Sequence, residues 1–326
     1  MSNERTAEIY NNMADEYDDI KDIWYGWVFS RLHYFIARFL EKRWDASSSR
    51  RCLDVGCGTG FQSILLGLCG YEVTGVDISD ELINKARQKK LNDYLARDLF
   101  ESQYDFVHEY SEEIRKTIAR LRGGAPSLPP SYKIGSATKL DFPDKSFDLV
   151  NCCGSTLSSI EDYDTAIQEM TRVLRSRGLM ILEVENKYNM DLVWPIIDTC
   201  LGGIIGYDQE IKISLANLFS YPSRHVRTDF PFSMHNEEVF LPIWLFSPSA
   251  FLRTLRSRGL RIMQIQAIHN FTNFIPSIAL DRVAPPLWLS KAFNLLAKIE
   301  VLTCSSPLFR CLGCSLVVFA EKCEET

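Results

Sequence analysis

Three glycines at alternate positions follow an acidic residue and a short apolar run in the stretch RCLDVGCGTGF. A glycine-rich turn directly after a strand lets the backbone approach a bound ligand closely, and a dinucleotide fingerprint has the spacing G-x-G-x-x-G around a pyrophosphate. Here the glycines are Gly56, Gly58 and Gly60, and Phe61 occupies the third dinucleotide position. Asp54, two residues before the first glycine, would repel a phosphate. The loop therefore suits a ligand that carries positive charge.

A second acidic residue, Asp77, ends the strand-like segment YEVTGVDIS, 17 residues after Gly60. A carboxylate in this position can accept hydrogen bonds from the hydroxyls of a ribose. A ribose without phosphate, joined to a positively charged amino-acid tail, describes S-adenosylmethionine. We therefore predict S-adenosylmethionine as the cofactor and S-adenosylhomocysteine as its product.

The elements that must position these residues alternate as in an open α/β fold. Strand patterns are expected at 52–57, 71–79, 132–137, 146–153, 179–185, 260–265 and 314–322. Helical patterns lie between them, at 61–70 and 163–176 among others, and each is followed by a glycine that can end a helix. We predict a Rossmann-like, doubly wound seven-stranded sheet with an inserted, mostly helical cap.

The chain divides into four parts on this pattern. We expect an N-terminal helical lid at 1–50, a core at 51–186 with an insertion at about 99–131, a cap at 187–246, and a C-terminal part of the core at 247–326 with an insertion at about 270–310. The cap and the last insertion are rich in large apolar residues, which favours an apolar pocket. A homodimer interface and a peripheral membrane contact, for which Trp194, Trp244 and Trp288 are suited, are alternatives.

Composition limits the class of protein. The 36 basic and 42 acidic residues give a net charge of −6 without a long basic run, so nucleic acid is not expected as a partner.

The N-terminus lacks the basic-then-apolar order of a secretory signal, and no apolar run reaches about 18 residues, so we predict a cytoplasmic protein. The ten cysteines are irregularly spaced and are expected to be reduced. Cys311 and Cys314 form a single C-x-x-C, and no metal site is predicted.

Four ordered motifs make the chain resemble the class I S-adenosylmethionine-dependent methyltransferases, in particular small-molecule methyltransferases of type 11. They are LDVGCGTGFQS at 53–63, VTGVDIS at 73–79, LDFPDKSFDLV at 140–150 and RVLRSRGLMILEVE at 172–185. The resemblance covers about 51–186 and extends through the last two strands to the terminus. It implies in-line transfer of a methyl group to a small acceptor, which the apolar cap suggests is hydrophobic or aromatic.

The resemblance also implies roles for individual residues along the loop and the second strand. Asp54 and the backbone of Gly56, Gly58 and Gly60 would hold the methionine and ribose portion. Asp77 would bind the ribose hydroxyls.

Further from the loop, Ile78 would lie against the adenine, and Ala137 would offer its backbone to the adenine edge. Ser136 stands where such enzymes often have an acidic residue, which puts the contact to the adenine amino group in question. Cys57, as a small filler of the glycine loop, and Cys153 complete the residues expected around the cofactor.

The N-terminal segment YNNMADEYDD resembles the lid of such enzymes, in which Tyr10 and Tyr17 would close over the sulfonium. Packing of the N-terminal helix alone would also explain both tyrosines.

An acceptor with a hydroxyl or ammonium group must lose a proton, which requires a base. The candidates are His235, within FPFSMHNEEVF, and Glu183, Glu185 and Tyr188 near the end of the fifth strand. Two other functions stay open: a cofactor-binding sensor or scaffold without transferase activity and, less favoured because of Phe61, a nicotinamide-dependent dehydrogenase.

Overall fold

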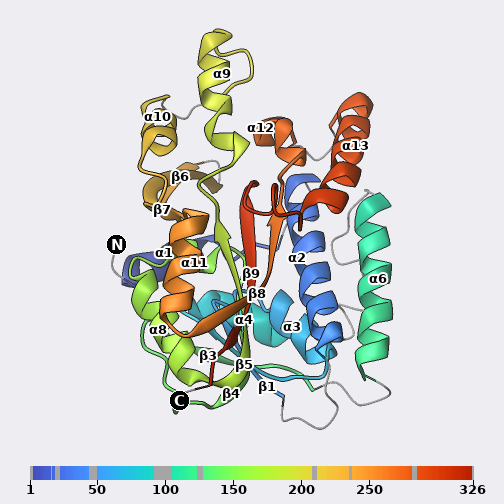
Figure 1. Ribbon diagram of the computed structural model, residues 1–326, viewed down its shortest axis with the longest axis vertical. Helices are drawn as coiled ribbons and strands as arrows, with labels where there is room; N and C mark the ends of the chain where they lie inside the picture. Colours follow the sequence, from blue (N-terminus) through green and yellow to red (C-terminus); the bar gives the residue numbers. More distant parts are fainter. Residues whose placement is uncertain are drawn as a thin grey trace.

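The computed structural model describes residues 3–15, 17–18, 23–43, 50–91, 105–122, 128–207, 211–234, 237–280 and 285–324. Within these residues a seven-stranded sheet has the order β3-β2-β1-β4-β5-β9-β8, with helices on both faces (Figure 1). β9 is antiparallel to its two neighbours, whereas the pairs from β3 to β5 are parallel. The predicted Rossmann-like, doubly wound sheet is confirmed.

All seven predicted strands are present. They are β1 (Arg51–Val55), β2 (Glu72–Asp77), β3 (Ser131–Ile134), β4 (Phe147–Cys152), β5 (Leu174–Glu185), β8 (Leu260–Ile268) and β9 (Ser315–Lys322). β4 is buried along its whole length, as continuous apolar strands inside a parallel sheet are. Neighbouring residues point to opposite faces of the sheet, so Leu149 joins one apolar core and Val150 the other.

The two cores lie under different helices. One face is covered by α2 (Ile23–Lys42), α3 (Phe61–Leu68), α6 (Asp105–Arg122) and α13 (Leu287–Thr303). The other is covered by α8 (Tyr163–Val173) and α11 (Pro248–Ser257). The described part of the 99–131 insertion is mainly α6, which packs beside α2 (Figure 1).

The predicted lid at 1–50 contains two helices with different surroundings. α1 (Asn3–Met13) lies across the carboxyl edge of the sheet, where it contacts α4 (Asp80–Gln88). α2 instead belongs to the core, because Trp27, Leu32 and Ile36 are buried against the sheet and its helices. Only α1 and the residues after it therefore occupy a lid position.

The cap at 187–246 combines the predicted helices with a hairpin that the sequence pattern did not predict. Its helices are η1 (Met190–Leu192), α9 (Trp194–Cys200) and α10 (Ile211–Phe219), and its strands are β6 (Val226–Met234) and β7 (Glu237–Leu245). Pro231 and Pro242 in these strands have no backbone N–H, so neither strand pattern fits the centre of a sheet. In a two-stranded ribbon each strand is an edge strand, where proline is tolerated.

The second insertion, at 270–310, contains η2 (Thr272–Phe274), α12 (Ser277–Leu280) and α13. In Figure 1, α9, α10, α12 and α13 all lie at one end of the molecule, opposite the C-terminus. None of the helices in the described residues is both long enough and apolar enough to cross a membrane.

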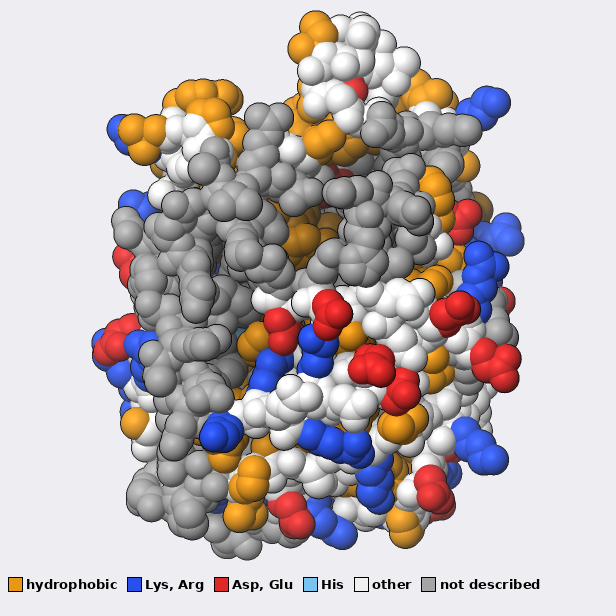
Figure 2. Space-filling view, turned by 180° about the vertical axis from the view of Figure 1, so that it is seen from behind, with side chains coloured by type: hydrophobic (Ala, Val, Ile, Leu, Met, Phe, Trp, Pro, Cys, Tyr) orange, Lys and Arg blue, Asp and Glu red, His pale blue; other side chains and the backbone are white. Residues whose placement is uncertain are grey.

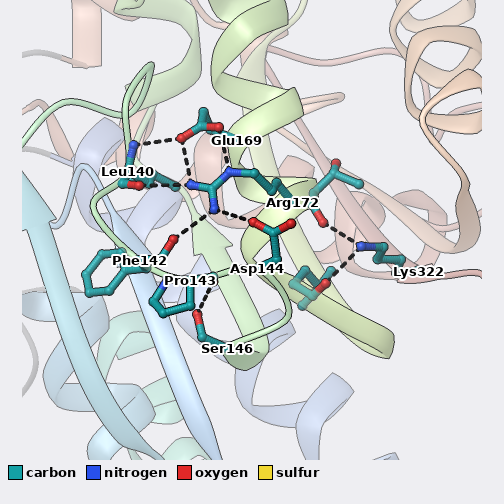
Figure 3. Close-up of polar contacts among 10 residues, drawn as sticks. Leu140, Phe142, Pro143, Asp144, Ser146, Glu169, Arg172 and Lys322 are labelled. Carbon is teal, nitrogen blue, oxygen red and sulfur yellow. Dashed lines mark hydrogen bonds and ion pairs between the residues drawn. The ribbon is translucent and has the colours of Figure 1, made fainter.

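The loop between β3 and β4 is fixed by Arg172, in the last turn of α8 (Figure 3). Its guanidinium donates to the carbonyls of Leu140 at 2.9 Å and Phe142 at 2.8 Å. It also pairs with Asp144 and Glu169. The basic residue at this helix end therefore holds the loop that begins with Ser136 and Ala137.

Candidate functional site

A cavity opens at the carboxyl ends of β2, β3 and β4, between α1 and α7 (Thr156–Ser159). Seven of the residues predicted to surround the cofactor line it: Tyr10, Tyr17, Gly56, Asp77, Ile78, Ser136 and Ala137. This edge of a doubly wound sheet is where such folds bind ligands.

Asp77 is the carboxylate on the cavity wall. One of its oxygens accepts a hydrogen bond from the backbone N–H of Gly58 at 2.8 Å and the other from that of Ser79 at 2.9 Å. Burial raises the pKa of this carboxyl, and backbone donors at Ser79, Gly58 and Ile78 oppose that shift. A carboxylate offers about four lone-pair sites, so acceptor capacity remains for a ligand. A ribose hydroxyl is such a donor.

The glycine loop is folded by contacts that only glycine allows. The N–H of Gly56 donates to the carbonyl of Val76 at 2.7 Å, which ties the loop to the end of β2. Gly56 has φ of 67°, and a Cβ at this position would overlap the side chain of Thr156. Close approach of α7 to the loop therefore requires glycine at this position.

Asp54 lies beneath the loop, away from the cavity wall. It accepts hydrogen bonds from the Ser63 hydroxyl at 2.5 Å and the Asn151 amide at 2.7 Å. Burial raises its pKa to about 6, against the opposing effect of these two donors. In this structure the residue holds β1, α3 and β4 together, and its contact with the methionine portion stays a prediction.

The remaining loop residues also lie behind the wall. Cys57 is buried with its thiol toward Gly75, and burial raises its pKa well above the usual value. Cys153 is buried too and contacts the Asn151 side chain at 3.2 Å. Gly58 and Gly60 contact Tyr17 and Tyr132 instead of lining the cavity.

The lid places two tyrosines on the cavity. The hydroxyl of Tyr10 lies 2.9 Å from that of Ser159 on α7, and the rings of Tyr10 and Tyr17 meet edge to face with centroids 6.5 Å apart. Burial raises the pKa of Tyr10 to about 12 and that of Tyr17 further, so both phenols are neutral. Their position fits the predicted lid, and their contact with a sulfonium stays a prediction.

Hydrogen bonds hold the lid on the site. Asn11 donates to Asp80 at 2.7 Å and accepts from the Ser79 hydroxyl at 2.5 Å. Asp18 accepts from Thr59 in the glycine loop and pairs with Lys89 at 2.6 Å. The lid is therefore joined to the same segments that surround Asp77.

The candidate bases differ in their surroundings. Glu183 and Glu185 are two residues apart on β5 and both bond to Ser155, which precedes α7. The Ser155 N–H donates to Glu183 and its hydroxyl donates to Glu185 at 2.5 Å. Burial, together with the charge of Glu183, raises the pKa of Glu185 to about 7. Ser155 has φ of 58°, a strained value for serine that these two bonds maintain. Neither Glu183 nor Glu185 lines the cavity, although Ser155, to which both bond, stands between the lining residues Gly154 and Thr156.

The other two candidates have different surroundings. Tyr188 directs its hydroxyl to the carbonyl of Pro222 at 3.0 Å, on the side of the β6–β7 hairpin. It does not line the cavity. His235 lies outside the described residues, so its role stays a prediction.

Sequence reasoning missed several cavity residues. Thr156 and Ser159 follow β4 in the stretch CCGSTLSS, and their place directly after a buried strand was the available signal. Arg227 and Glu161 form an ion pair of 2.8 Å at the rim, from segments 66 residues apart. No local pattern could have joined them.

The cavity fits S-adenosylmethionine better than a dinucleotide. Among the described lining residues the only cation is Arg227, which Glu161 neutralises. Asp77 then leaves the wall acidic, which disfavours a pyrophosphate and suits a sulfonium and an ammonium group. The residues present would bind the ribose through Asp77 and place Ile78, Leu82 and Ala137 beside an apolar ring.

These features define a Rossmann-like protein with a nucleoside site at the carboxyl edge of its sheet. A family model described as a methyltransferase domain matches residues 27–265. The chain therefore belongs to this methyltransferase family, which confirms the predicted class I S-adenosylmethionine-dependent methyltransferase and its cofactor.

Curated relatives include demethylmenaquinone methyltransferases. The one from Oceanobacillus iheyensis is 28% identical over 182 residues, which cover 55% of this chain and 60% of that protein. The one from Staphylococcus aureus strain MRSA252 is 26% identical over 182 residues, 55% of this chain and 59% of that protein. The chain thus spans about three fifths of the length of the relatives it matches.

Solved structures agree on the fold. The 4+2 cyclase SpnF superposes with a TM-score of 0.54 at 16% identity, over 99% of this chain and 97% of that one. Magnesium protoporphyrin IX methyltransferase from Synechocystis PCC 6803 superposes with a TM-score of 0.53 at 14% identity, over 98% and 100%. At these identities the similarity shows the fold alone.

Proposed function

We propose that the chain transfers the methyl group of S-adenosylmethionine to a small aromatic acceptor whose hydroxyl must ionise. The observation that carries the proposal is a buried apolar cluster that packs behind one residue of the cavity wall, Tyr10. Ile9 in the lid, Leu192 in η1 and Leu241, Ile243 and Leu245 in β7 form one buried cluster, against which Tyr10 packs. Tyr10 also lines the cavity, so an acceptor beside the cofactor would contact apolar surface.

Bound S-adenosylmethionine supplies a methyl group on a positively charged sulfur, which makes it an electrophile. The chain contributes position and exclusion of water, because the lid covers the cavity with Tyr10 and Tyr17. Neutral phenols at this place do not repel positive charge.

Ser155 and Glu185 supply the path for the acceptor proton. Ser155 Oγ already donates to Glu185 at 2.5 Å, and the serine is not fully buried. As the acceptor oxygen attacks, its proton passes to Ser155 Oγ while the serine proton passes to the Glu185 carboxylate. A carboxyl with a pKa of about 7 is suited to accept a proton near neutral pH. Glu183 fixes the backbone of Ser155 and is a positioning residue.

The relatives named demethylmenaquinone methyltransferase support a reduced quinone as the first acceptor to test. The purified chain would be incubated with methyl-labelled S-adenosylmethionine and reduced demethylmenaquinone, and products would be identified by mass. Label in the quinone product supports the proposal. Cofactor binding without label in this acceptor or in a cell extract would favour a sensor, and the cyclase with the same fold makes that outcome a real alternative.

Glu185→Gln tests the proton path once an acceptor is found. Removal of a general base lowers kcat by about 100-fold or more, with little change in cofactor affinity. Glu183→Gln is the matched variant, because its amide oxygen can still accept the Ser155 N–H. Equal kcat for wild type and Glu185→Gln on a hydroxyl acceptor would remove Glu185 from the mechanism.

A further inference from the structure

Helix α13 is apolar on two opposite faces. Its buried face carries Leu289, Phe293 and Ala297. Its outward face carries Trp288, Leu295, Ile299 and Leu302. The spacings of seven, four and three place the outward residues on one side of a helix of 3.6 residues per turn. Trp288, Leu295 and Leu302 are 69%, 62% and 82% exposed, so this stripe has no partner among the described residues that would cover it.

Other apolar side chains are exposed on the helices at the same end of the molecule. Leu201 and Ile204 lie in the turn after α9, which projects furthest in Figure 1, and Ile204 is 83% exposed. Phe219 at the end of α10 is also 83% exposed. Figure 2 shows hydrophobic side chains on this projection and at the upper corners of the molecule. We call Leu201, Ile204, Phe219, Trp288, Leu295 and Leu302 the apolar end.

The exposed charged side chains that the structure describes around the apolar end are basic. In the described parts of 189–225 and 270–313 they are Lys212, Arg224, Lys291 and Lys298. The acidic residues there are withdrawn from the surface: Asp198 and Glu300 are buried, and half-buried Asp191 accepts a bond from Tyr207. The whole chain has a net charge of −6, so this end differs from the average surface.

Lys291 and Lys298 lie beside the apolar stripe of α13, on the same flank. At 100° per residue they stand roughly 20° to 80° from Trp288, Leu295 and Leu302, so their stems and the stripe share one surface. A helix with an exposed apolar stripe, a tryptophan and flanking lysines matches the pattern of segments that lie in a membrane interface.

We propose that the apolar end docks onto the surface of an anionic phospholipid membrane. Its apolar side chains enter the interface, and its lysines and arginine contact the lipid phosphates. A symmetric contact through α13 with a second copy fits less well, because it would bring Lys291 and Lys298 of one copy beside the same lysines of the other. The docking does not depend on the proposed transfer reaction. With that reaction, it would bring the cap, which contributes Arg227 to the cavity lining, to the membrane.

The test is co-sedimentation of the full chain with vesicles of phosphatidylcholine, with and without phosphatidylglycerol. We expect binding to the anionic vesicles that weakens as salt is added. The double variant Leu295→Glu, Leu302→Glu should reduce the partition coefficient on the order of tenfold or more. It loses two apolar side chains that would enter the membrane and gains two negative charges, which the anionic lipids repel. Lys291→Gln and Lys298→Gln should each reduce it about fivefold.

The matched control is Leu128→Glu, which places the same charge at a half-exposed leucine on another part of the surface. Binding of S-adenosylhomocysteine by each variant, measured by calorimetry, shows that it is folded. The proposal is overturned if folded wild type does not bind anionic vesicles, or if the α13 variants bind as wild type does. It is also overturned if these variants abolish a dimer, seen by light scattering, while vesicle binding is absent. Each readout is independent of methyl transfer, so the proposed function can fail without affecting it.

Discussion

Buried carboxylates beside α13 and near the cavity differ in how many hydrogen-bond donors surround each one. Glu300 on α13 accepts from Trp27 Nε1 and the His269 N–H, both at 2.8 Å, and from two N–H groups and one hydroxyl at Phe271 and Thr272. Around the cavity, Asp77 receives two backbone N–H bonds. Glu185 receives one hydroxyl and a weak thiol contact from Cys314 at 3.5 Å.

We interpret the difference as one between a structural group, Glu300, and the two groups that we propose to be functional. The five donors to Glu300 come from α2 and from residues 269–272 after β8, so its carboxyl group joins both of these segments to α13. Asp77 and Glu185 accept fewer hydrogen bonds, so each keeps acceptor capacity for a ligand or a proton. Burial raises the pKa of both carboxyl groups. Incomplete satisfaction of a buried carboxylate is therefore the better sign of a site.

The largest expected effect is on stability, at Glu300→Ala. Loss of the carboxylate leaves the indole of Trp27 and several N–H groups buried without acceptors, so the free energy of unfolding should fall on the order of 4 kcal/mol. Urea unfolding measures this. Glu112→Ala on the exposed side of α6 is the control and should change the value by less than about 0.5 kcal/mol. A loss at Glu300→Ala below about 1 kcal/mol would break the comparison.

The next effect is on cofactor affinity, at Asp77→Ala. Loss of the carboxylate should weaken S-adenosylhomocysteine binding by about 1.5 to 3 kcal/mol, because ribose hydroxyls lose a charged acceptor. Calorimetry of the folded variant measures this. Asp141→Ala removes an exposed carboxylate from the loop between β3 and β4 that does not line the cavity, and this variant should bind nearly as wild type does. Equal affinity for Asp77→Ala and wild type would place the ribose elsewhere.

A smaller effect on cofactor affinity, at Gly56, distinguishes a steric clash of the added Cβ from backbone strain at positive φ. Gly56→Ala should weaken cofactor binding roughly tenfold, because a Cβ would push Thr156 from the cavity wall and alanine is strained at positive φ. Gly202→Ala has similar strain, with φ of 79°, but nothing within 4 Å of its Cβ. Calorimetry should find wild-type affinity for Gly202→Ala. Similar losses in both variants would assign the effect to strain alone.

A further effect, again on stability, is a pH dependence at Glu185. Its pKa of about 7 lies above the usual 4.5, so the folded chain keeps a proton that the unfolded chain releases between these values. The free energy of unfolding of wild type should therefore fall as pH rises from about 4.5 to 7, relative to Glu185→Gln. Urea unfolding at several pH values measures the difference between the two curves. Parallel curves would mean that Glu185 is ionised in the folded chain throughout this range.

Local patterns were sufficient for the sheet and for part of the site. Apolar runs ending in Gly56 and Asp77 predicted β1 and β2, because a strand buried on both faces is continuous and apolar. The hairpin was missed because its prolines weaken the strand pattern. No local pattern could show that α2 packs in the core, because the burial of Trp27 depends on α13, far away in the sequence.

The order of the motifs, the spacing of the glycines and the place of Asp77 after a strand defined the family and the cofactor, because these are relations between near neighbours in the chain. The roles of the other carboxylates came from the folded arrangement. Trp27 and Glu300 are 273 residues apart, and Ser155 and Glu185 are 30 apart. Whether a buried carboxylate is structural or reactive depends on how many donors the fold brings to it, and those donors are remote in the sequence.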